Sequence, residues 1–217
     1  MTEFSRNRVI VFAKQPLPGY AKSRLGADLG EEESAGVYAR LLYSYLHSLM
    51  SLDLQQYLVE LSAAEVEDIP FFEEAFPEFL VRPQSYGNLG QRMAAAFQRA
   101  FDEGADCVVL TGSDIPDLAE SVIMEAFSKL EKFSVVLGPA VDGGYFLIGM
   151  TQPCVSIFSN IIWSGETVME QTLERIEEEG LLAGLLAERE DIDHISSFNR
   201  WFDRKRALRR EVEYKDR

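Results

Sequence analysis

The stretch 107–118, CVVLTGSDIPDL, places the strongest limit on what this chain can fold into. It begins with an apolar run and continues into small polar residues and a proline, which is typical of a buried strand that ends in a loop. In an open α/β sheet, ligands bind outside the carboxyl ends of the strands. We therefore expect Asp114 at the rim of a ligand site, where a carboxylate can hold a divalent metal on a phosphate. The alternative is that Asp114 caps a helix that begins near Pro116.

Similar short apolar runs recur along the chain, and segments with helical periodicity separate them. The predicted strands are residues 8–13, 56–62, 79–82, 107–110, 135–137 and 145–149. The predicted helices are residues 31–50, 68–75, 93–103, 118–131, 165–179 and 196–214, with Ser164 as the N-cap of the fifth. This alternation predicts an α/β fold with three layers, α/β/α, around a mostly parallel mixed sheet. The DGG turn at residues 142–144 predicts a hairpin, which adds an antiparallel strand.

Composition narrows the class of protein. The 217 residues are most simply one domain, and the net charge of −15 argues against nucleic-acid binding, which needs a basic face. No apolar run is long enough to span a bilayer and the N-terminus lacks a signal-peptide core, so we expect neither a membrane span nor secretion. The two cysteines, Cys107 and Cys154, lack metal-ligand spacing, and the expectation is a reduced, cytoplasmic protein.

A cationic loop follows the first predicted strand. Residues 14–25, KQPLPGYAKSRL, contain prolines and Gly19, which disfavour both helix and strand. Three cations, Lys14, Lys22 and Arg24, lie in this loop of an acidic chain. Cations beside backbone N–H groups are what a triphosphate cradle requires, although the spacing of a Walker A motif is absent. A solvated loop is the alternative, and we favour phosphate binding because the loop follows the first strand of an α/β pattern.

Three further segments hold candidate site residues. Residues 85–92 lead into a helix, so Gln91 or Arg92 could contact a base or a phosphate, although N-capping explains the segment equally well. Asp142 lies in the predicted hairpin turn, where it either shapes the turn or faces a ligand. Late in the chain, a pair of aspartates stands at residues 191 and 193.

Four blocks together resemble one protein family: VFAKQPLPGYAKSRL (11–25), TGSDIPDL (111–118), GPAVDGGYFLIG (138–149) and DID (191–193). The family is the bacterial group of candidate glycosyltransferases of unassigned substrate, also described as selenodomain-associated transferases. It is similar to phospholactate and molybdenum-cofactor guanylyltransferases. The resemblance covers nearly the whole chain and implies a Rossmann-like nucleotide-diphospho-sugar transferase (GT-A) fold. It implies one domain, 1–217, with a nucleotide-binding half at 1–117 and an acceptor-binding half at 118–217.

The resemblance also implies roles for individual residues. Nucleotide binding falls to Ala13, Lys14, Gly19, Lys22, Arg24, Gln91 and Ser113. Acceptor binding falls to Asp142, Gly143, Gly144 and Tyr145. Mg²⁺ or Mn²⁺ would be held by Asp114 and Asp193, with Asp191 as the alternative to Asp193. The catalytic residues would be Lys14, Lys22, Arg24 and Asp114. In these roles the cations offset charge on the phosphates.

Three functions from different classes follow from these features. The first is metal-dependent transfer of a nucleotidyl group from an NTP to a small phosphorylated or acidic acceptor. The cationic loop favours it, because a triphosphate needs more countercharge than a nucleotide-diphospho-sugar. The second is glycosyl transfer from a nucleotide-diphospho-sugar, which a single metal carboxylate would favour. The third is a nucleotide-binding protein that keeps the fold without catalysis. The apolar side of the C-terminal helix either packs internally or forms a homodimer.

Overall fold

A seven-stranded sheet in the order β3-β2-β1-β4-β6-β5-β7 forms the centre of the computed structural model, which describes residues 7–163 and 165–215, the stretch 208–215 by its backbone alone. The strands are β1 (Asn7–Ala13), β2 (Tyr57–Ala63), β3 (Leu80–Pro83), β4 (Cys107–Thr111), β5 (Val135–Pro139), β6 (Tyr145–Met150) and β7 (Ala183–Leu185). Neighbouring strands are parallel, except that β6 runs antiparallel to both β4 and β5. The mostly parallel mixed sheet and the β5–β6 hairpin are therefore confirmed.

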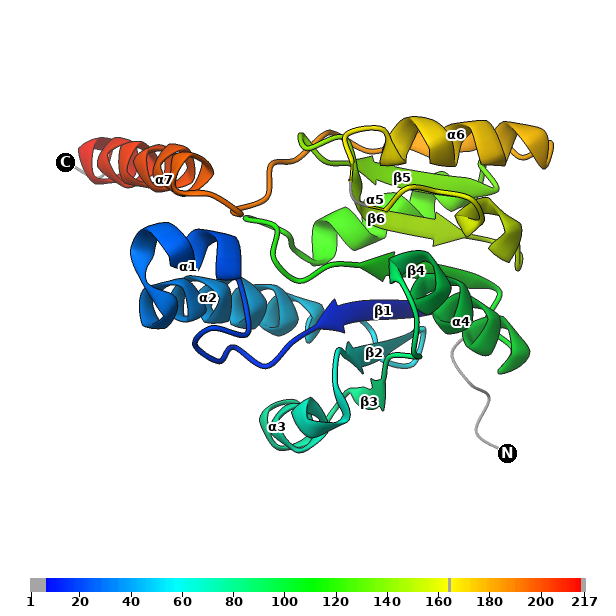
Figure 1. Ribbon diagram of the computed structural model, residues 1–217, viewed down its shortest axis with the longest axis horizontal. Coiled ribbons are helices and arrows are strands. Elements are labelled where there is room, and N and C mark those ends of the chain that lie inside the picture. The colour runs from blue at the N-terminus through cyan, green and yellow to red at the C-terminus, as the bar shows by residue number, and fades with distance from the viewer. Residues whose placement is uncertain (1–6, 164, 216–217) are drawn as a thin grey trace.

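Helices cover both faces of this sheet (Figure 1). They are α1 (Ser23–Leu29), α2 (Glu31–Leu49), α3 (Ile69–Ala75), α4 (Leu89–Asp102), α5 (Glu120–Leu130), α6 (Val168–Glu178) and α7 (Ile195–Lys215), with short 3₁₀ turns η1 (Val66–Asp68) and η2 (Val155–Phe158). One apolar core holds side chains of α2, α3 and α5, and a second core holds side chains of α4, α6 and η2. The three predicted layers are thereby confirmed.

Alternation of side chains along the strands creates the two cores. In β1, Val9 and Val11 face the first core and Ile10 faces the second. In the adjacent β4, Val109 faces the first core and Val108 the second. Successive side chains of a strand point to opposite faces, and a central strand covered on both sides must be apolar throughout. This is why residues 9–13 of β1 and 107–110 of β4 read as unbroken apolar runs in the sequence.

A network of charged side chains, buried at Arg8 and Glu60, joins β1 and β2 to the C-terminal end of α4. Arg8 and Glu60 are 1% and 0% exposed, and Arg8 Nη1 lies 3.6 Å from Glu60 Oε2. Arg8 also donates to Glu103 at 2.5 Å, Arg82 donates to the same carboxylate at 2.5 Å, and Arg99 pairs with Glu60. Although burial alone would raise it, the pKa of Glu103 is lowered because Arg82 and Arg8 stabilise the charged form. These charges compensate one another, which a buried ion requires.

The structure differs from the sequence prediction in two short elements. The predicted loop 14–25 is interrupted by α1, which begins at Ser23 and is seven residues long. Its N-cap, Lys22, has a left-handed backbone conformation (φ 54°, ψ 44°) and makes no side-chain cap, so the usual sequence signal for a helix start is absent. The edge strand β7 was not predicted either, because it has only three residues.

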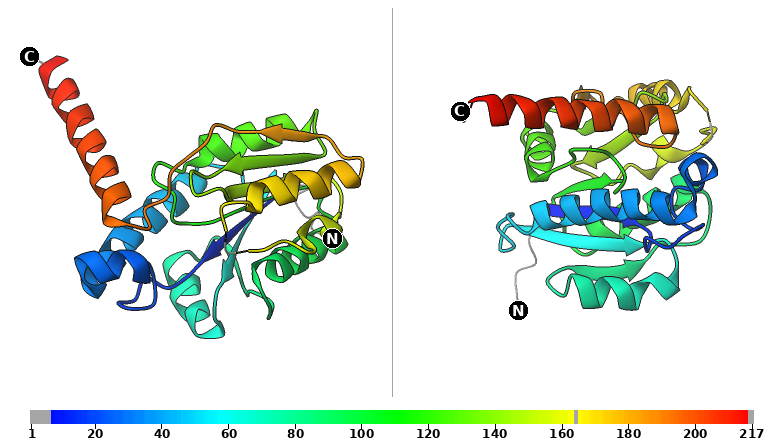
Figure 2. Two further views of the ribbon diagram at one scale, coloured as in Figure 1. Left: turned by 45° about the horizontal axis from the view of Figure 1, so that its top comes forward. Right: turned by 90° about the vertical axis from the view of Figure 1, so that its left-hand side faces the viewer.

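The C-terminal helix α7 extends away from the sheet, as Figure 2 shows in red. Its first turns carry Phe198 and Trp201, which pack against a small apolar cluster that includes Leu25 of α1 and Ile192. Phe202, on the same helix, is 51% exposed. Internal packing of the apolar side is thus confirmed for Phe198 and Trp201.

Ser164, predicted as the N-cap of α6, lies outside the described residues. Of the helices described, none combines the length and apolar character needed to cross a membrane.

Candidate functional site

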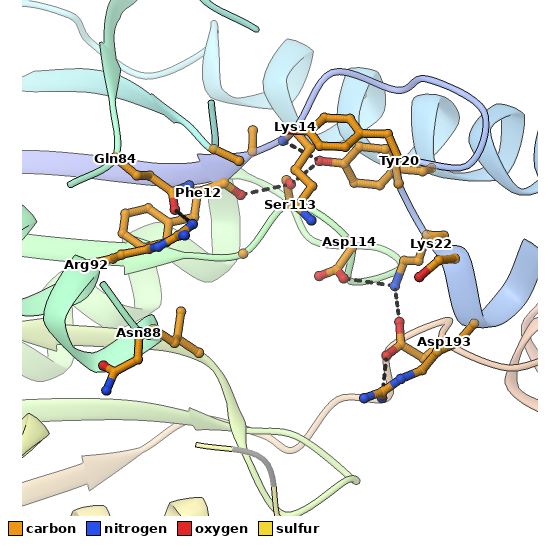
Figure 3. A pocket seen from close by; sticks show the side chains of 18 of the residues that line it. Phe12, Lys14, Tyr20, Lys22, Gln84, Asn88, Arg92, Ser113, Asp114 and Asp193 are labelled. Atoms are coloured by element: carbon orange, nitrogen blue, oxygen red, sulfur yellow. Dashed lines mark hydrogen bonds and ion pairs between the residues drawn. The ribbon is translucent and has the colours of Figure 1, made fainter. Parts of the chain in front are cut away.

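A cavity of about 650 Å³ lies where β1 and β4 end side by side (Figure 3). Both strands are parallel, so the loop after Ala13 and the loop after Thr111 open into the same space. This is the edge at which α/β sheets bind ligands. These two loops form two walls of the cavity. The β3–α4 connection forms a third wall, and the segment before α7 forms a fourth. The side chains at its polar rim are Lys14, Lys22, Arg24, Gln84, Asn88, Arg92, Ser113, Asp114 and Asp193.

Tyr38 of α2 fastens the two loops to each other. Its hydroxyl oxygen accepts a hydrogen bond from the backbone N–H of Lys14 at 3.0 Å and lies 2.8 Å from Ser113 Oγ. The Ser113 hydroxyl donates its only proton to the carbonyl oxygen of Phe12 at 3.0 Å, so Tyr38 is the donor toward Ser113. Burial raises the pKa of Tyr38 to about 12, so its proton stays in place at neutral pH. The sequence did not single out Tyr38.

Lys22 lies between two carboxylates at the centre of the rim. Its Nζ is 2.9 Å from Asp114 Oδ2 and 2.8 Å from Asp193 Oδ1, and Figure 3 shows both carboxylates directed at it. Its side chain is 4% exposed, whereas those of Asp114 and Asp193 are 40% and 28% exposed. Burial alone would lower the pKa of Lys22, but the two carboxylates outweigh it and raise the pKa. Lys22 is therefore held as a cation.

A second cation of the same loop, Arg24, pairs with Asp193. Arg24 Nη1 lies 3.3 Å from Asp193 Oδ2, and its side chain is 71% exposed. Although burial would raise it, the pKa of Asp193 is lowered because Lys22 and then Arg24 favour the ionised carboxylate.

Asp114 does not cap the helix that follows it, which was the alternative to a metal ligand. Helix α5 begins at Glu120 without a side-chain cap, and the backbone N–H of Glu120 bonds to Ser48 Oγ instead.

The carboxylates of Asp114 and Asp193 could supply part of the coordination shell of a divalent cation. Oxygens of Asp114 and Asp193, 79 positions apart in the sequence, converge on one positively charged atom. Mg²⁺ is commonly held by one or two carboxylates, with water and substrate phosphates completing the shell. Within residues 7–163 and 165–207, whose side chains the structure describes, no group of three or more histidine, cysteine or acidic side chains could hold a metal by itself. Any metal here would therefore need further oxygens from water or from a bound ligand.

The wall at the start of α4 is held by side-chain hydrogen bonds. Gln84 donates to the carbonyl oxygen of Ser62 at 2.9 Å and accepts from Arg92 Nη1 at 3.3 Å. Arg92 Nε also donates to the carbonyl oxygen of Gly87 at 2.9 Å. Gln91 forms the reciprocal half of a capping box with Asn88, so its side chain is used to begin the helix. The capping alternative thus describes Gln91, and Arg92 is the neighbour that lines the cavity.

A second cavity, of about 480 Å³, adjoins the first. Five residues line both, among them Phe12, Arg24 and Asp114. Its walls come from β6, the turn before β6 and the segment before α6. Asp191 lines this cavity, whereas Asp193 lines the first. Burial, followed by the nearby carboxylate of Asp193, raises the pKa of Asp191 to about 6.

Comparison with known proteins identifies the family. A family model described as "Uncharacterized protein conserved in bacteria (DUF2064)" matches residues 49–165. The chain belongs to the DUF2064 family. A search of curated proteins found no match.

Solved structures extend the likeness beyond the DUF2064 match. A protein of Desulfovibrio desulfuricans G20, described as a candidate nucleotide-diphospho-sugar transferase, is 33% identical and has a TM-score of 0.81 over 88% of this chain and 83% of that chain. An inositol-1-phosphate CTP transferase from T. maritima is 16% identical, with a TM-score of 0.55 and coverage of 90% and 92%. A Mycobacterium tuberculosis H37Rv protein in complex with manganese is 13% identical, with a TM-score of 0.52 and coverage of 92% and 99%. The last two show the fold alone, and together the three confirm the predicted GT-A-like α/β fold.

The structure brings most of the predicted site residues of this DUF2064 chain together. The first cavity is lined by Ala13, Lys14, Lys22, Arg24, Ser113, Asp114 and Asp193. The second is lined by Asp142, Gly144 and Tyr145. Three predicted residues line neither cavity: Gly19, Gln91 and Gly143. Gly19 packs against the carboxylate of Glu31, and Gly143 packs against the backbone of Glu166.

Proposed function

We propose that this chain is a metal-dependent nucleotidyltransferase, which transfers a nucleotidyl group from an NTP to a small-molecule acceptor. The observation that carries the proposal is the convergence of Asp114 and Asp193 on Lys22, at the point where the two cavities meet. A nucleotide in the first cavity would place its phosphates beside these charges. An acceptor in the second cavity would then lie next to the phosphates, which is the arrangement that a displacement reaction needs.

Each half of the chain has a role in this proposal. Residues 1–117 supply the first cavity's cations, and Lys14 and Arg24 would offset the negative charge of the leaving pyrophosphate. Residues 118–217 supply most of the second cavity and Asp193. Asp114 and Asp193 would hold Mg²⁺ or Mn²⁺, which neutralises charge on phosphate oxygens when it is bound. The manganese complex of a protein with the same fold supports this choice of ion.

The reaction balances without a covalent enzyme intermediate. An oxygen of the acceptor forms a bond to the α-phosphorus of the NTP. The bond between that phosphorus and the oxygen bridging to the β-phosphorus breaks, pyrophosphate leaves with the electron pair, and the acceptor's proton passes to water. Positioning and charge stabilisation are sufficient for such a transfer. The resemblance to phospholactate and molybdenum-cofactor guanylyltransferases also supports nucleotidyl transfer.

Glycosyl transfer from a nucleotide-diphospho-sugar is the second candidate function. One observation favours it specifically: the protein that shares 33% of its residues with this chain is described as a candidate nucleotide-diphospho-sugar transferase. In that reaction the donor's sugar would occupy part of the second cavity, and a nucleoside diphosphate would leave. The three cations near the phosphates favour the triphosphate donor instead.

A thermal-shift screen with the four NTPs and common nucleotide-diphospho-sugars, with and without Mg²⁺, distinguishes the two functions. A ligand present at 100 times its Kd stabilises the folded state by about 2.7 kcal/mol. For a domain of this size, that raises the melting temperature by about 5–10 °C. We expect a Mg²⁺-dependent shift with one or more NTPs. Asp114→Asn should abolish the shift, and Asp142→Asn, on the rim of the second cavity, should keep it. A shift with sugar nucleotides alone would support glycosyl transfer, and no shift with any nucleotide would overturn both proposals.

A further inference from the structure

The second cavity has an apolar wall that is firmly packed. Tyr145 and Trp163 line it with their rings edge to face, 6.4 Å apart. The indole of Trp163 lies directly on Gly90 of α4, where a Cβ atom would come within 2.4 Å of the ring. Phe146 and Met93 are among the other apolar residues of the lining. A wall of aromatic side chains offers a flat surface to the nonpolar face of a ligand.

The polar rim of this cavity is fixed by backbone contacts. A Cβ atom on Gly143 would lie 2.1 Å from the carbonyl oxygen of Glu166, and Gly143 has a φ of 85°. The backbone N–H of Met169 donates to the carbonyl oxygen of Gly143 at 2.9 Å. Asp142 Oδ1 accepts from the backbone N–H of Gly144 at 3.0 Å. The turn 140–144 and the segment before α6 therefore hold the backbone of Asp142 and Glu166 at one rim, and the carboxylate of Asp142 bonds back to the turn.

Charge along the lining is almost entirely negative. Four acidic residues line the second cavity: Asp114, Asp142, Glu166 and Asp191. Among the described residues of the lining, Arg24 is the single cation, and it is already paired with Asp193 at 3.3 Å. An anionic ligand would meet these like charges, which are offset only in part by Arg24 and by Lys22, whose Nζ lies 2.9 Å from Asp114. Like-charge contacts of this kind exclude a ligand more strongly than missing contacts do.

We propose that the second cavity binds an acceptor that carries hydroxyl groups and one apolar face and bears no negative charge, of which a pyranose or an aminopyranose is the simplest example. Its hydroxyl groups donate to the carboxylates of the rim, and charge-assisted hydrogen bonds of this kind are the strong ones. Its apolar face lies on the aromatic wall. We propose this acceptor in place of the phosphorylated or acidic acceptor that the sequence predicted. The proposal rests on the proposed function in one respect, which is that the nucleotide binds in the first cavity.

The charge of the cavity can be tested without knowing the ligand, because the chain has two tryptophans. Trp201→Phe leaves Trp163 as the single tryptophan, and it removes no hydrogen bond because Trp201 Nε1 has no partner among the described residues. Quenching of Trp163 by caesium and by iodide is measured and normalised to quenching of N-acetyltryptophanamide. We expect caesium to quench about threefold or more better than iodide after normalisation. Equal quenching, or stronger quenching by iodide, would overturn the proposal.

Four probes with the same ring then test the ligand class: glucose, glucosamine, glucuronate and glucose 6-phosphate, each at millimolar concentration in saturation-transfer NMR. We expect signals from glucose and glucosamine, with glucuronate and glucose 6-phosphate binding at least about tenfold more weakly. In Asp142→Asn/Glu166→Gln, the discrimination against glucuronate should decrease. Comparable or stronger binding of either anion, or no signal from any of the four, would contradict the proposal. NTP binding is measured on the same protein, so a failure at the second cavity is distinguished from a failure of the proposed nucleotide site.

Discussion

Replacing Lys22 by methionine should make this protein bind Mn²⁺ more tightly in the absence of nucleotide. The ammonium of Lys22 lies at hydrogen-bonding distance from both proposed metal ligands, at 2.9 Å from Asp114 and 2.8 Å from Asp193. A metal that binds both carboxylates must first displace it. Methionine is unbranched like lysine and one heavy atom shorter, and the left-handed backbone position of residue 22 is sterically similar for both. The substitution thus removes the charge and little else.

The size of the effect follows from the charge that is removed. One charge within about 4–6 Å of a carboxyl group shifts its pKa by about 1–3 units, and each unit corresponds to about 1.4 kcal/mol. Since the side chains of Asp114 and Asp193 are 40% and 28% exposed, solvent screens the interaction and the lower limit applies. About 1.4 kcal/mol is a tenfold change in affinity. We expect the Kd of Mn²⁺ to fall by about tenfold in Lys22→Met.

Electron paramagnetic resonance of free Mn²⁺ during titration measures this Kd directly. Arg24→Gln is the matched control, because Arg24 pairs with Asp193 alone and its side chain is 71% exposed. The control should change the Kd by about twofold or less. Lys22→Met should also weaken NTP binding more than it weakens binding of the free nucleoside. If Lys22→Met is folded and its Mn²⁺ affinity is unchanged or lower than that of the native chain, the metal site at Asp114 and Asp193 is refuted.

Three further predictions concern other parts of the molecule. Asp114→Ala should abolish Mg²⁺-dependent nucleotide binding in calorimetry while the circular dichroism spectrum is unchanged, and retained binding would remove Asp114 from the metal site. Glu103→Gln should cost about 1–2 kcal/mol of unfolding free energy at pH 7. The folded pKa of Glu103 is lowered, so its contribution to stability is present above the unfolded pKa and is lost as the pH falls through the folded pKa. In urea denaturation, the difference in unfolding free energy between the native chain and Glu103→Gln should therefore be smaller at pH 3 than at pH 7. Gly143→Ala should cost about 2–4 kcal/mol, since the new Cβ meets the backbone of Glu166 at a positive φ, and urea denaturation giving a loss below about 0.5 kcal/mol would contradict this.

The sequence predicted the sheet well because its strands are marked locally. The strand 107–111 is an apolar run that ends at small polar residues, and Asp114 was expected at the strand's end for that reason. The two missed elements lack such marks. Helix α1 begins after Lys22 without a capping side chain, and β7 is defined by its parallel pairing with β5, about 48 residues earlier in the chain. Elements that exist through a distant partner leave little trace in their own residues.

For the candidate site, too, the sequence predicted some features and missed others. Lys22, Asp114 and Asp193 were all selected from the sequence, but their arrangement was not, because the salt bridge from Lys22 to Asp193 joins residues 171 positions apart. The expectation was a metal held by two carboxylates beside free cations. The structure shows that one of those cations occupies the space between the carboxylates. Gln84 was missed because it stands alone after a short strand, and its role as a wall residue depends on Ser62 and Arg92.

One small apolar cluster explains how the two distant ends of that salt bridge meet. Leu25 of α1 and Ile192 are 0% and 1% exposed, and both belong to the cluster that α2 forms with the start of α7. Leu25 lies three positions after Lys22, and Ile192 directly precedes Asp193. Burial of each side chain therefore fixes the backbone beside a charged residue of the site. Burying a leucine or isoleucine is worth about 1.5–3 kcal/mol. The attraction between Asp193 and Lys22, whose side chain is 4% exposed, is offset by the cost of removing the ammonium from water, so the apolar cluster fixes the positions of the two charges.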